Sequence, residues 1–413
     1  MKLRSVRGTH DIYGQHIKKY NKIEKIVCKN AELHSFNRLE TPIFEFSEIF
    51  SKPLGEQSDV VLKEMYSFKD RNEEMLTLRP EYTTPMIRAA ITNNLLSQLP
   101  LKLFGIGPMF RRERPQKGRY RQFNQINFEI FGSNDFLADL ELIVIANEIL
   151  VSILPNVNFT LNINNLGQKN NLSDYKVKLT KYFNDHKDKL SNESKEKIYS
   201  NPLRILDSKN DYDIKISNNA PKIIDIISKE ERNNFNELKK GLNFFKINFK
   251  ENHKLVRGLD YYCSTVFEFK TSELGTQDTL LGGGRYDGLI NTLGGPDIPG
   301  VGWAAGVERI SILMNEIEKS NNIIHLAISD KKYVEHILNI INHLRKNNIP
   351  FYWNYKYNLK KSLSYANSNN IEYVIIIGEH EYINNYLTIR NLNTGNQSRV
   401  EVSEIKNIFN DKF

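Results

Sequence analysis

Apolar residues near the start of the chain recur with the spacing of a helix. Over residues 16–35 they fall on one stripe: Ile17, Tyr20, Ile23, Ile26, Val27 and Ala31. This stripe predicts an amphipathic helix. The next stretch, Phe36 to Phe44, predicts a strand that contains Pro42. Because proline cannot donate to a strand ladder, we expect this strand at a sheet edge or at an interface. Residues 68–78 alternate around a charged turn and predict a hairpin.

Two further helices and a second hairpin are expected in the next part of the chain. Pro85 is a favourable first helical residue and predicts a helix to about Leu99. A longer helix should cover residues 135–153, with its cap supplied by residues 133–135. Between these helices, residues 123–131 alternate polar and apolar side chains, as a half-buried strand does. With the strand before it, this segment predicts an antiparallel hairpin with a charged tip.

Residues 169–254 differ from the rest of the chain in composition and in periodicity. They hold many lysines and asparagines, show helical periodicity and carry few strand signals. We interpret them as an inserted helical subdomain, and the alternative is a solvated spacer. Strand signals return at residues 255–270 and in the glycine-rich stretch 281–306, and a helix is expected over 304–320.

The last part of the chain alternates strands with helices. The expected elements are strands at 323–328, 351–355 and 373–377, helices at 332–346 and 359–369, a hairpin through 393–396 and a last helix from Ser403. Such alternation predicts an α/β domain with a largely parallel sheet. We therefore expect two domains, residues 1–322 and 323–413, and the first carries the helical insertion at about 169–254.

Composition narrows the class of protein. The chain has 413 residues, of which 40% are hydrophobic and 26% charged, with a formal net charge of +8 and a pI of about 9.1. This balance favours a soluble multidomain protein with an anionic partner. No apolar leader opens the chain, and charged residues interrupt its most apolar window, 140–154, so neither secretion nor a membrane partner is expected. Cys28 and Cys263 show no zinc-ligand spacing, so we expect a reduced, cytoplasmic protein without disulfides or metal ligands.

The tip of the second hairpin carries the strongest chemical signal. Its cations are Arg111, Arg112, Arg114, Lys117, Arg119 and Arg121. The planar fork of arginine suits phosphate, so this loop could hold a polyphosphate and contact nucleic acid. The alternative is a solvated charged loop. Gln125 and Glu129 favour the binding interpretation over the solvated loop. They share one face of the following strand with Asn127, and a row of polar side chains is unusual in a hydrophobic core.

Five ordered segments resemble the histidyl-tRNA synthetase family of class II aminoacyl-tRNA synthetases, over essentially the whole chain. Thr41-Pro42 and Glu45 lie where motif 1, the dimer strand, is expected. The other matches are motif 2 at 110–132, motif 3 at 300–310 and two histidine-specific signatures, LVRGLDYYCSTVFEF at 255–269 and GGGRYDGL at 282–289. The opening RGTHDI and the segment LRPEYTTP agree with the same family.

Two positions depart from the family pattern. Tyr82 follows Arg-Pro-Glu where the family usually has glycine, and a positive φ there would strain a tyrosine. Cys263 stands where the family often has a polar residue, and as a small filler it is a milder change.

The resemblance implies a fold and a reaction. The fold would be an α+β catalytic domain, with an antiparallel sheet flanked by helices and the helical insertion, followed by an α/β anticodon-binding domain. The protein would be a homodimer that activates histidine with ATP and Mg²⁺ and transfers the histidyl group to the 3′ end of tRNA(His). One rival is a non-catalytic paralogue, the regulatory subunit of ATP phosphoribosyltransferase, which would lack the C-terminal unit and the arginines at 111, 257 and 309. Another is an RNA-binding protein of a different class, which would explain the charge but not a polar pocket.

The resemblance also assigns roles residue by residue. The catalytic arginines would be Arg111, Arg257 and Arg309, which also bind ATP together with Glu113 and Phe123. The histidine site would consist of Glu81, Thr83, Gln125, Glu129, Tyr262 and Tyr286. The acceptor end of tRNA would meet Arg114, Gln116 and Arg121, with Lys117 and Arg119 beside them. The rings available for anticodon bases would be Tyr352, Trp353, Tyr355 and Tyr357.

From the residues alone, purely structural roles stay open for these side chains. Each arginine could form a structural salt bridge, Tyr262 could be a packed strand aromatic, and Glu129 could be a paired carboxylate. The rings of the last domain could belong to its core. We interpret Asp260 and Asp287 as structural residues.

Overall fold

The computed structural model describes residues 3–55, 60–275, 278–317 and 323–409. The chain divides into two compact units, Met1–Glu316 and Ile317–Phe413. The boundary expected from the sequence, between residues 322 and 323, directly follows residues 318–322, which lie outside the described residues. Among the described helices, none is both long and apolar enough to cross a membrane.

The described part of the first unit is built on an eight-stranded sheet with the order β1-β5-β6-β11-β10-β9-β7-β8. Its strands are β1 (Asn37–Arg38), β5 (Leu101–Phe110), β6 (Gln122–Phe131), β7 (Thr160–Asn165), β8 (Phe249–Glu251), β9 (Cys263–Lys270), β10 (Thr279–Arg285) and β11 (Gly300–Gly306). The central pairs from β5 to β7 are antiparallel, and only the short edge strands β1 and β8 pair in parallel. The expected antiparallel sheet is confirmed.

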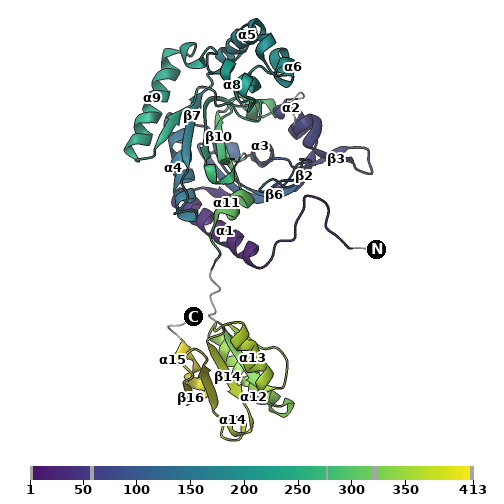
Figure 1. Cartoon of the computed structure of the whole chain (residues 1–413), viewed down its shortest axis with the longest axis vertical. Helices are drawn as coiled ribbons and strands as arrows, with labels where there is room; N and C mark the ends of the chain where they lie inside the picture. The colour runs from purple at the N-terminus through teal and green to yellow at the C-terminus, as the bar shows by residue number, and fades with distance from the viewer. Residues whose placement is uncertain (1–2, 56–59, 276–277, 318–322, 410–413) are drawn as a thin grey trace. The chain divides into compact units, whose positions relative to one another are not determined.

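Helices flank this sheet (Figure 1). They are α1 (Gln15–Leu33), α2 (Glu48–Leu54), α3 (Thr83–Thr92), α4 (Phe136–Ile153), α10 (Leu289–Thr292) and α11 (Val307–Leu313). Helix α4 begins where its cap predicts, because the Asp135 side chain accepts from the Leu137 N–H at 2.9 Å. It is apolar on nearly every side and largely buried, as a helix packed between other elements should be.

Three elements expected in this unit, one strand and two helices, were wrong in their extent. Residues 36–44 do not form one strand: β1 belongs to the large sheet, whereas β2 (Phe44–Phe46) pairs with β4 (Met75–Leu78) in a three-stranded sheet completed by β3 (Tyr66–Lys69). Pro42, which lacks a donor, lies in the segment between β1 and β2. The helices expected to reach Leu99 and Ser320 end earlier, at Thr92 and Leu313.

The helices between β7 and β8 form a packed structure. They are α5 (Lys169–Asp185), α6 (Asn192–Ser200), α7 (Leu203–Leu206), α8 (Asp211–Ser217) and α9 (Lys229–Phe244). Apolar side chains of α5, such as Leu179 and Phe183, share a hydrophobic core with residues of the eight-stranded sheet. Asp213 accepts hydrogen bonds from three serines, which lower its pKa although burial opposes them. A solvated spacer would have neither feature.

The described part of the second unit has a five-stranded sheet with the order β13-β12-β14-β15-β16. Its strands are β12 (Ile324–Ile328), β13 (Phe351–Tyr352), β14 (Tyr373–Ile377), β15 (Leu387–Asn391) and β16 (Gln397–Val400). Its helices are α12 (Val334–Lys346), α13 (Leu359–Ser368), α14 (Glu379–Ile383) and α15 (Ile405–Phe409). The strands β12, β13 and β14 are parallel, and the expected hairpin adds the antiparallel strands β15 and β16.

Candidate active site

One cavity of about 350 Å³ gathers the arginines of three distant segments. Arg111 follows β5, Arg257 precedes β9, and Arg309 lies in α11. The cavity is also lined by Glu81, Thr83, Glu113, Phe123, Gln125 and Tyr262. Of the residues predicted for histidine and ATP, only Glu129 and Tyr286 are outside this lining.

Arg257 lies in a space that a glycine provides. A Cβ atom at Gly282 would lie 2.2 Å from Nη2 of Arg257, so a side chain on β10 would displace the guanidinium. Nη1 of Arg257 lies 3.2 Å from Oε2 of Glu268, whose other oxygen pairs with Lys270 at 2.7 Å. Tyr262 lies beneath the guanidinium, with its ring centroid 5.8 Å from Cζ. The glycine-rich stretch therefore makes room for a cation at this wall.

The other two arginines are held through their Nε atoms by backbone carbonyls. Nε of Arg111 donates to the Pro80 carbonyl at 2.8 Å, and its guanidinium lies over Phe123 at 5.5 Å. Nε of Arg309 donates to the Gly118 carbonyl at 3.2 Å, and Nη1 donates to the Thr279 carbonyl at 2.9 Å. Burial first, and then repulsion from neighbouring arginines, lowers the pKa of Arg309. Such repulsion is relieved when a polyanion binds.

Arg119 joins this cationic wall, although the sequence grouped it with the tRNA-binding loop. It lines the cavity and forms ion pairs with Glu113 and, at 4.0 Å, with Glu64. Burial and the nearby Arg111 lower its pKa, whereas Glu64 raises it. No feature of the sequence separates Arg119 from Arg121. The chain turns at Gly118, where φ is 72°, and Arg119 directly after this turn lines the cavity.

The other residues predicted to meet the tRNA acceptor end lie outside the cavity lining: Arg114, Gln116, Lys117 and Arg121. Arg114 and Gln116 are exposed at the tip. Arg121 instead packs against the N-terminal segment: its N–H donates to the Gly8 carbonyl at 2.8 Å. A Cβ atom at Gly8 would lie 2.8 Å from Cγ of Arg121, and the ring of His10 lies 4.6 Å from that of Tyr120. The RGTHDI segment therefore supports the base of the loop.

The polar side of the cavity offers an unsatisfied acceptor at Gln125. Gln125 is nearly buried, and within the described residues its Oε1 has no hydrogen-bond donor. Glu81, also buried, accepts from the N–H groups of Thr83 and Thr84 at 2.7 and 2.8 Å, at the N-terminus of α3. A buried acceptor without a donor is costly, so a ligand donor at Gln125 would be favourable.

Glu129 lies beneath this surface as a fully buried, paired carboxylate. It accepts from the Thr83 hydroxyl at 2.7 Å, from Nδ2 of Asn127 at 3.3 Å and from the Tyr286 hydroxyl. Burial raises the pKa of Glu129 to about 8, against the opposing effect of these three donors. Any Cβ atom at Gly302 would overlap the carboxylate. The paired-carboxylate interpretation that the sequence left open therefore describes Glu129 in this structure.

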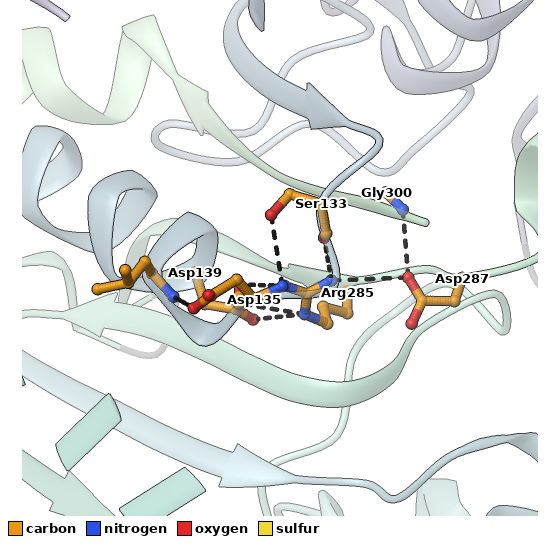
Figure 2. A network of polar contacts seen from close by, with 7 residues as sticks. Ser133, Asp135, Asp139, Arg285, Asp287 and Gly300 are labelled. Atoms are coloured by element: carbon orange, nitrogen blue, oxygen red, sulfur yellow. Dashed lines mark hydrogen bonds and ion pairs between the residues drawn. The ribbon is translucent and has the colours of Figure 1, made fainter. Parts of the chain in front are cut away.

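Arg285 and Asp287, which flank Tyr286 in the sequence, both belong to a network of polar contacts (Figure 2). Arg285 is buried and forms an ion pair with Asp139 of α4, while its Nη1 and Nη2 donate to the Ser133 and Asp135 carbonyls, each at 2.8 Å. On the other side, Asp287 accepts from the Gly300 N–H at 3.2 Å. As interpreted from the sequence, Asp287 makes structural contacts. So does Asp260, which accepts from Asn201 at 3.2 Å.

Tyr82 and Tyr261 complete the comparison with the sequence. The backbone at Tyr82 has φ of −106° and ψ of −23°, so the tyrosine carries no left-handed strain. Tyr261 lines the cavity with its ring 4.7 Å from that of Tyr262, and was not singled out. Its position beside Tyr262 in the LDYY segment was the available signal.

The described carboxylates do not form a metal cage. Among the described residues, no group of three or more histidine, cysteine, aspartate or glutamate side chains could hold a metal ion. At the cavity, Glu268 pairs with Arg257 and Lys270, and Glu113 pairs with Arg119.

Sequence profiles match both units. The histidyl-tRNA synthetase family profile matches residues 8–190, and an anticodon-binding domain profile matches residues 321–412. A histidine–tRNA ligase of Ehrlichia canis (strain Jake) is 44% identical over 414 residues, covering 100% of this chain and 99% of the relative. The chain belongs to the histidyl-tRNA synthetase family.

Solved structures of this family have the same fold. Apo histidyl-tRNA synthetase of S. aureus superposes with a TM-score of 0.82 at 29% identity, covering 99% of this chain and 100% of that one. A Bacillus halodurans protein described as an ATP phosphoribosyltransferase regulatory subunit/histidyl-tRNA synthetase gives a TM-score of 0.67 at 20% identity, covering 92% of this chain and 99% of that one. At that identity the likeness concerns the fold alone.

Proposed function

We propose that the chain joins histidine to tRNA(His) in two steps. A carboxylate oxygen of histidine attacks the α-phosphorus of ATP, which forms histidyl-adenylate and releases pyrophosphate. A hydroxyl of the terminal ribose of tRNA(His) then attacks the carbonyl carbon, and AMP leaves. The observation that carries the proposal is the convergence of Arg111, Arg257 and Arg309 on a cavity that also contains Glu81 and Gln125.

The arginines supply the electrostatics of the first step. In-line attack at phosphorus needs positioning and relief of negative charge. Arg111 holds the α-phosphate and the histidine carboxylate, Arg257 approaches from the other wall, and Arg309 binds the γ-phosphate. Phe123, next to Arg111, stacks on the adenine, and Glu113 lies near its amino group. Mg²⁺ would be held by the phosphates, since the described carboxylates offer no cage.

The polar side recognises histidine. Glu81 and Gln125 accept from the α-ammonium group beside the Thr83 hydroxyl, and the Tyr262 hydroxyl meets one imidazole nitrogen. Glu129 acts from below, because it orients the hydroxyls of Thr83 and Tyr286. An analogue that lacks the ring nitrogens would leave buried polar groups unpaired, which discriminates by about 10⁴ or more.

The proposed tRNA contacts involve both units. Arg114, Gln116 and Arg121 serve the acceptor end: the arginines hold phosphates and Gln116 contacts a base edge. In the second unit, the anticodon-binding profile supports contact with unpaired bases. Tyr355 is the most exposed of the four predicted residues, at 77%, against 37% for Tyr352 and 36% for Tyr357. Trp353 packs against the core and Tyr352 stacks with Tyr365, so Tyr355 is our candidate for stacking on a base.

A single ring tests the anticodon contact. Tyr355→Ala should raise the KM for tRNA about tenfold, because stacking on one base is worth roughly 1–3 kcal/mol. Histidine-dependent pyrophosphate exchange should stay unchanged, and Tyr382→Ala, at another exposed ring of this unit, should leave both values unchanged. An unaltered KM for tRNA in Tyr355→Ala would remove this contact from the proposal.

An exposed apolar face supports a homodimer. In the three-stranded sheet, Phe44, Phe46 and Phe68 are about half exposed and share a face with Leu76 and Leu78. An apolar patch of this kind is typical of an interface. Phe46→Glu should give monomers in light scattering, whereas Val177→Glu, at an exposed position of α5, should remain dimeric. A monomeric wild type would contradict the proposal.

The alternative function is that of the non-catalytic paralogue. The three arginines in one cavity favour the enzyme, as does the C-terminal unit. Exchange of labelled pyrophosphate into ATP that depends on histidine, measured without tRNA, separates the two: the enzyme catalyses it and the paralogue does not. We place the protein in the cytoplasm, in keeping with the free thiols of Cys28 and Cys263.

A further inference from the structure

Tyr82 lies between two residues of the polar side without lining the cavity itself. It caps α3, and its neighbours Glu81 and Thr83 both line the cavity. Glu81 accepts from the first N–H groups of α3, and Thr83 donates to Glu129. The position of residue 82 therefore sets where both neighbouring side chains enter the cavity.

The ring of Tyr82 is fully buried and contacts two other segments of the chain. Its hydroxyl donates to the Leu39 carbonyl at 3.2 Å. Cζ of Arg79 lies 4.3 Å from the ring centroid, and Nη1 of Arg79 donates to the Thr41 carbonyl at 2.8 Å. Tyr82 thus connects the start of α3 to the segment that joins β1 and β2.

Two glycines of β5 leave the space for this pair. A Cβ atom at Gly105 would lie 2.2 Å from Cε1 of Tyr82, and one at Gly107 would lie 2.5 Å from Nη2 of Arg79. Because Gly105 pairs with Asn127 of β6, the strand that receives the ring neighbours the strand that carries Gln125 and Glu129. The aromatic ring, β5 and the polar row of β6 are therefore in one packed layer.

We propose that Tyr82 is a positioning residue for the histidine site, seated on Gly105 and fixing Glu81 and Thr83 relative to β6. The proposal rests on the function proposed above, in that the polar side is taken to bind histidine. It predicts that the side chains at positions 82 and 105 are complementary in size, and that a change in this fit alters the affinity for histidine.

The test is a double-mutant cycle measured by pyrophosphate exchange. Gly105→Ala should raise the histidine KM about tenfold, which corresponds to ~1.4 kcal/mol, because the methyl group displaces the ring. Tyr82→Ala should raise it by a similar factor. The double variant should be no worse than Tyr82→Ala, because the added methyl then enters the vacated space. In all of them the KM for ATP should change less than twofold.

Two controls separate positioning from simple loss of stability. Tyr82→Phe keeps the ring and should stay within about twofold of the wild-type histidine KM. Tyr175→Ala removes another buried tyrosine whose hydroxyl donates to a carbonyl, that of Pro221 at 2.8 Å in the helical insertion. It should lower the melting temperature without moving the histidine KM.

Each outcome bears on one claim. If the wild type shows no histidine-dependent exchange, the proposed function fails. If the wild type is active but Gly105→Ala and Tyr82→Ala change only the melting temperature or the active fraction, the positioning role is overturned. Additive effects of the two substitutions on the histidine KM would also contradict it.

Discussion

The two sides of the cavity are built in opposite ways. On the phosphate side, Arg111, Arg257 and Arg309 line one cavity. Burial first, and then repulsion from Arg119 and Arg111, lowers the pKa of Arg309. On the histidine side, Glu129 is buried and hydrogen-bonded to three donors. The first side gathers cations that repel one another and is therefore complementary to a polyanion, whereas on the second side the Glu129 carboxyl group already has three hydrogen-bond donors. Substitutions should therefore affect catalysis on one side and both folding and specificity on the other.

The largest effect is expected at Arg257. Arg257→Ala should reduce pyrophosphate exchange by about 10²–10³-fold, since one preorganised donor is worth roughly 3–4 kcal/mol in the transition state. The melting temperature should change little, because Glu268 keeps its ion pair with Lys270. Near-normal exchange in this variant would remove Arg257 from the phosphate side.

Glu129 should show the opposite behaviour. Glu129→Ala leaves the buried hydroxyls of Thr83 and Tyr286 without their acceptor, at about 1–3 kcal/mol each. We expect a histidine KM raised by about 30-fold or more together with a lower melting temperature. An unchanged histidine KM would contradict the account of this side.

Gln125 sharpens the comparison within the histidine side. Its Oε1 has no donor within the described residues, so Gln125→Met should not lower the melting temperature. The same change should raise the histidine KM about tenfold, because it removes an acceptor from the ligand. Loss of stability without a change in KM would mean that Gln125 serves the fold and not the ligand.

The smallest effect concerns pH. Burial raises the pKa of Glu129 from 4.5 to about 8, so between these values the folded state binds a proton that the unfolded state has released. Stability from this group is therefore present below about pH 4.5 and is lost as the pH rises through about 8. Glu129→Gln should flatten this part of the melting curve against pH. A parallel loss in both proteins between pH 6 and 9 would assign the pH dependence to other groups.

Local sequence patterns predicted the secondary-structure elements and the motifs well, but not which side chains reach the cavity and which are buried beneath it. Helix α4 follows from its cap and its apolar run, and the three arginines from their motifs. The strand expected over residues 36–44 was wrong because its two ends pair in different sheets. Likewise, strand periodicity placed Gln125 and Glu129 on one face but could not say that only Gln125 reaches the cavity. That difference depends on Thr83 and Tyr286, which come from other segments.

The most direct test of the central claim is the affinity of a non-hydrolysable histidyl-adenylate analogue, measured by calorimetry. One such ligand spans both sides, so Arg257→Ala and Gln125→Met should each weaken its binding by about tenfold or more. Unchanged affinity in either variant would show that the two sides do not bind one adenylate, and would contradict the account.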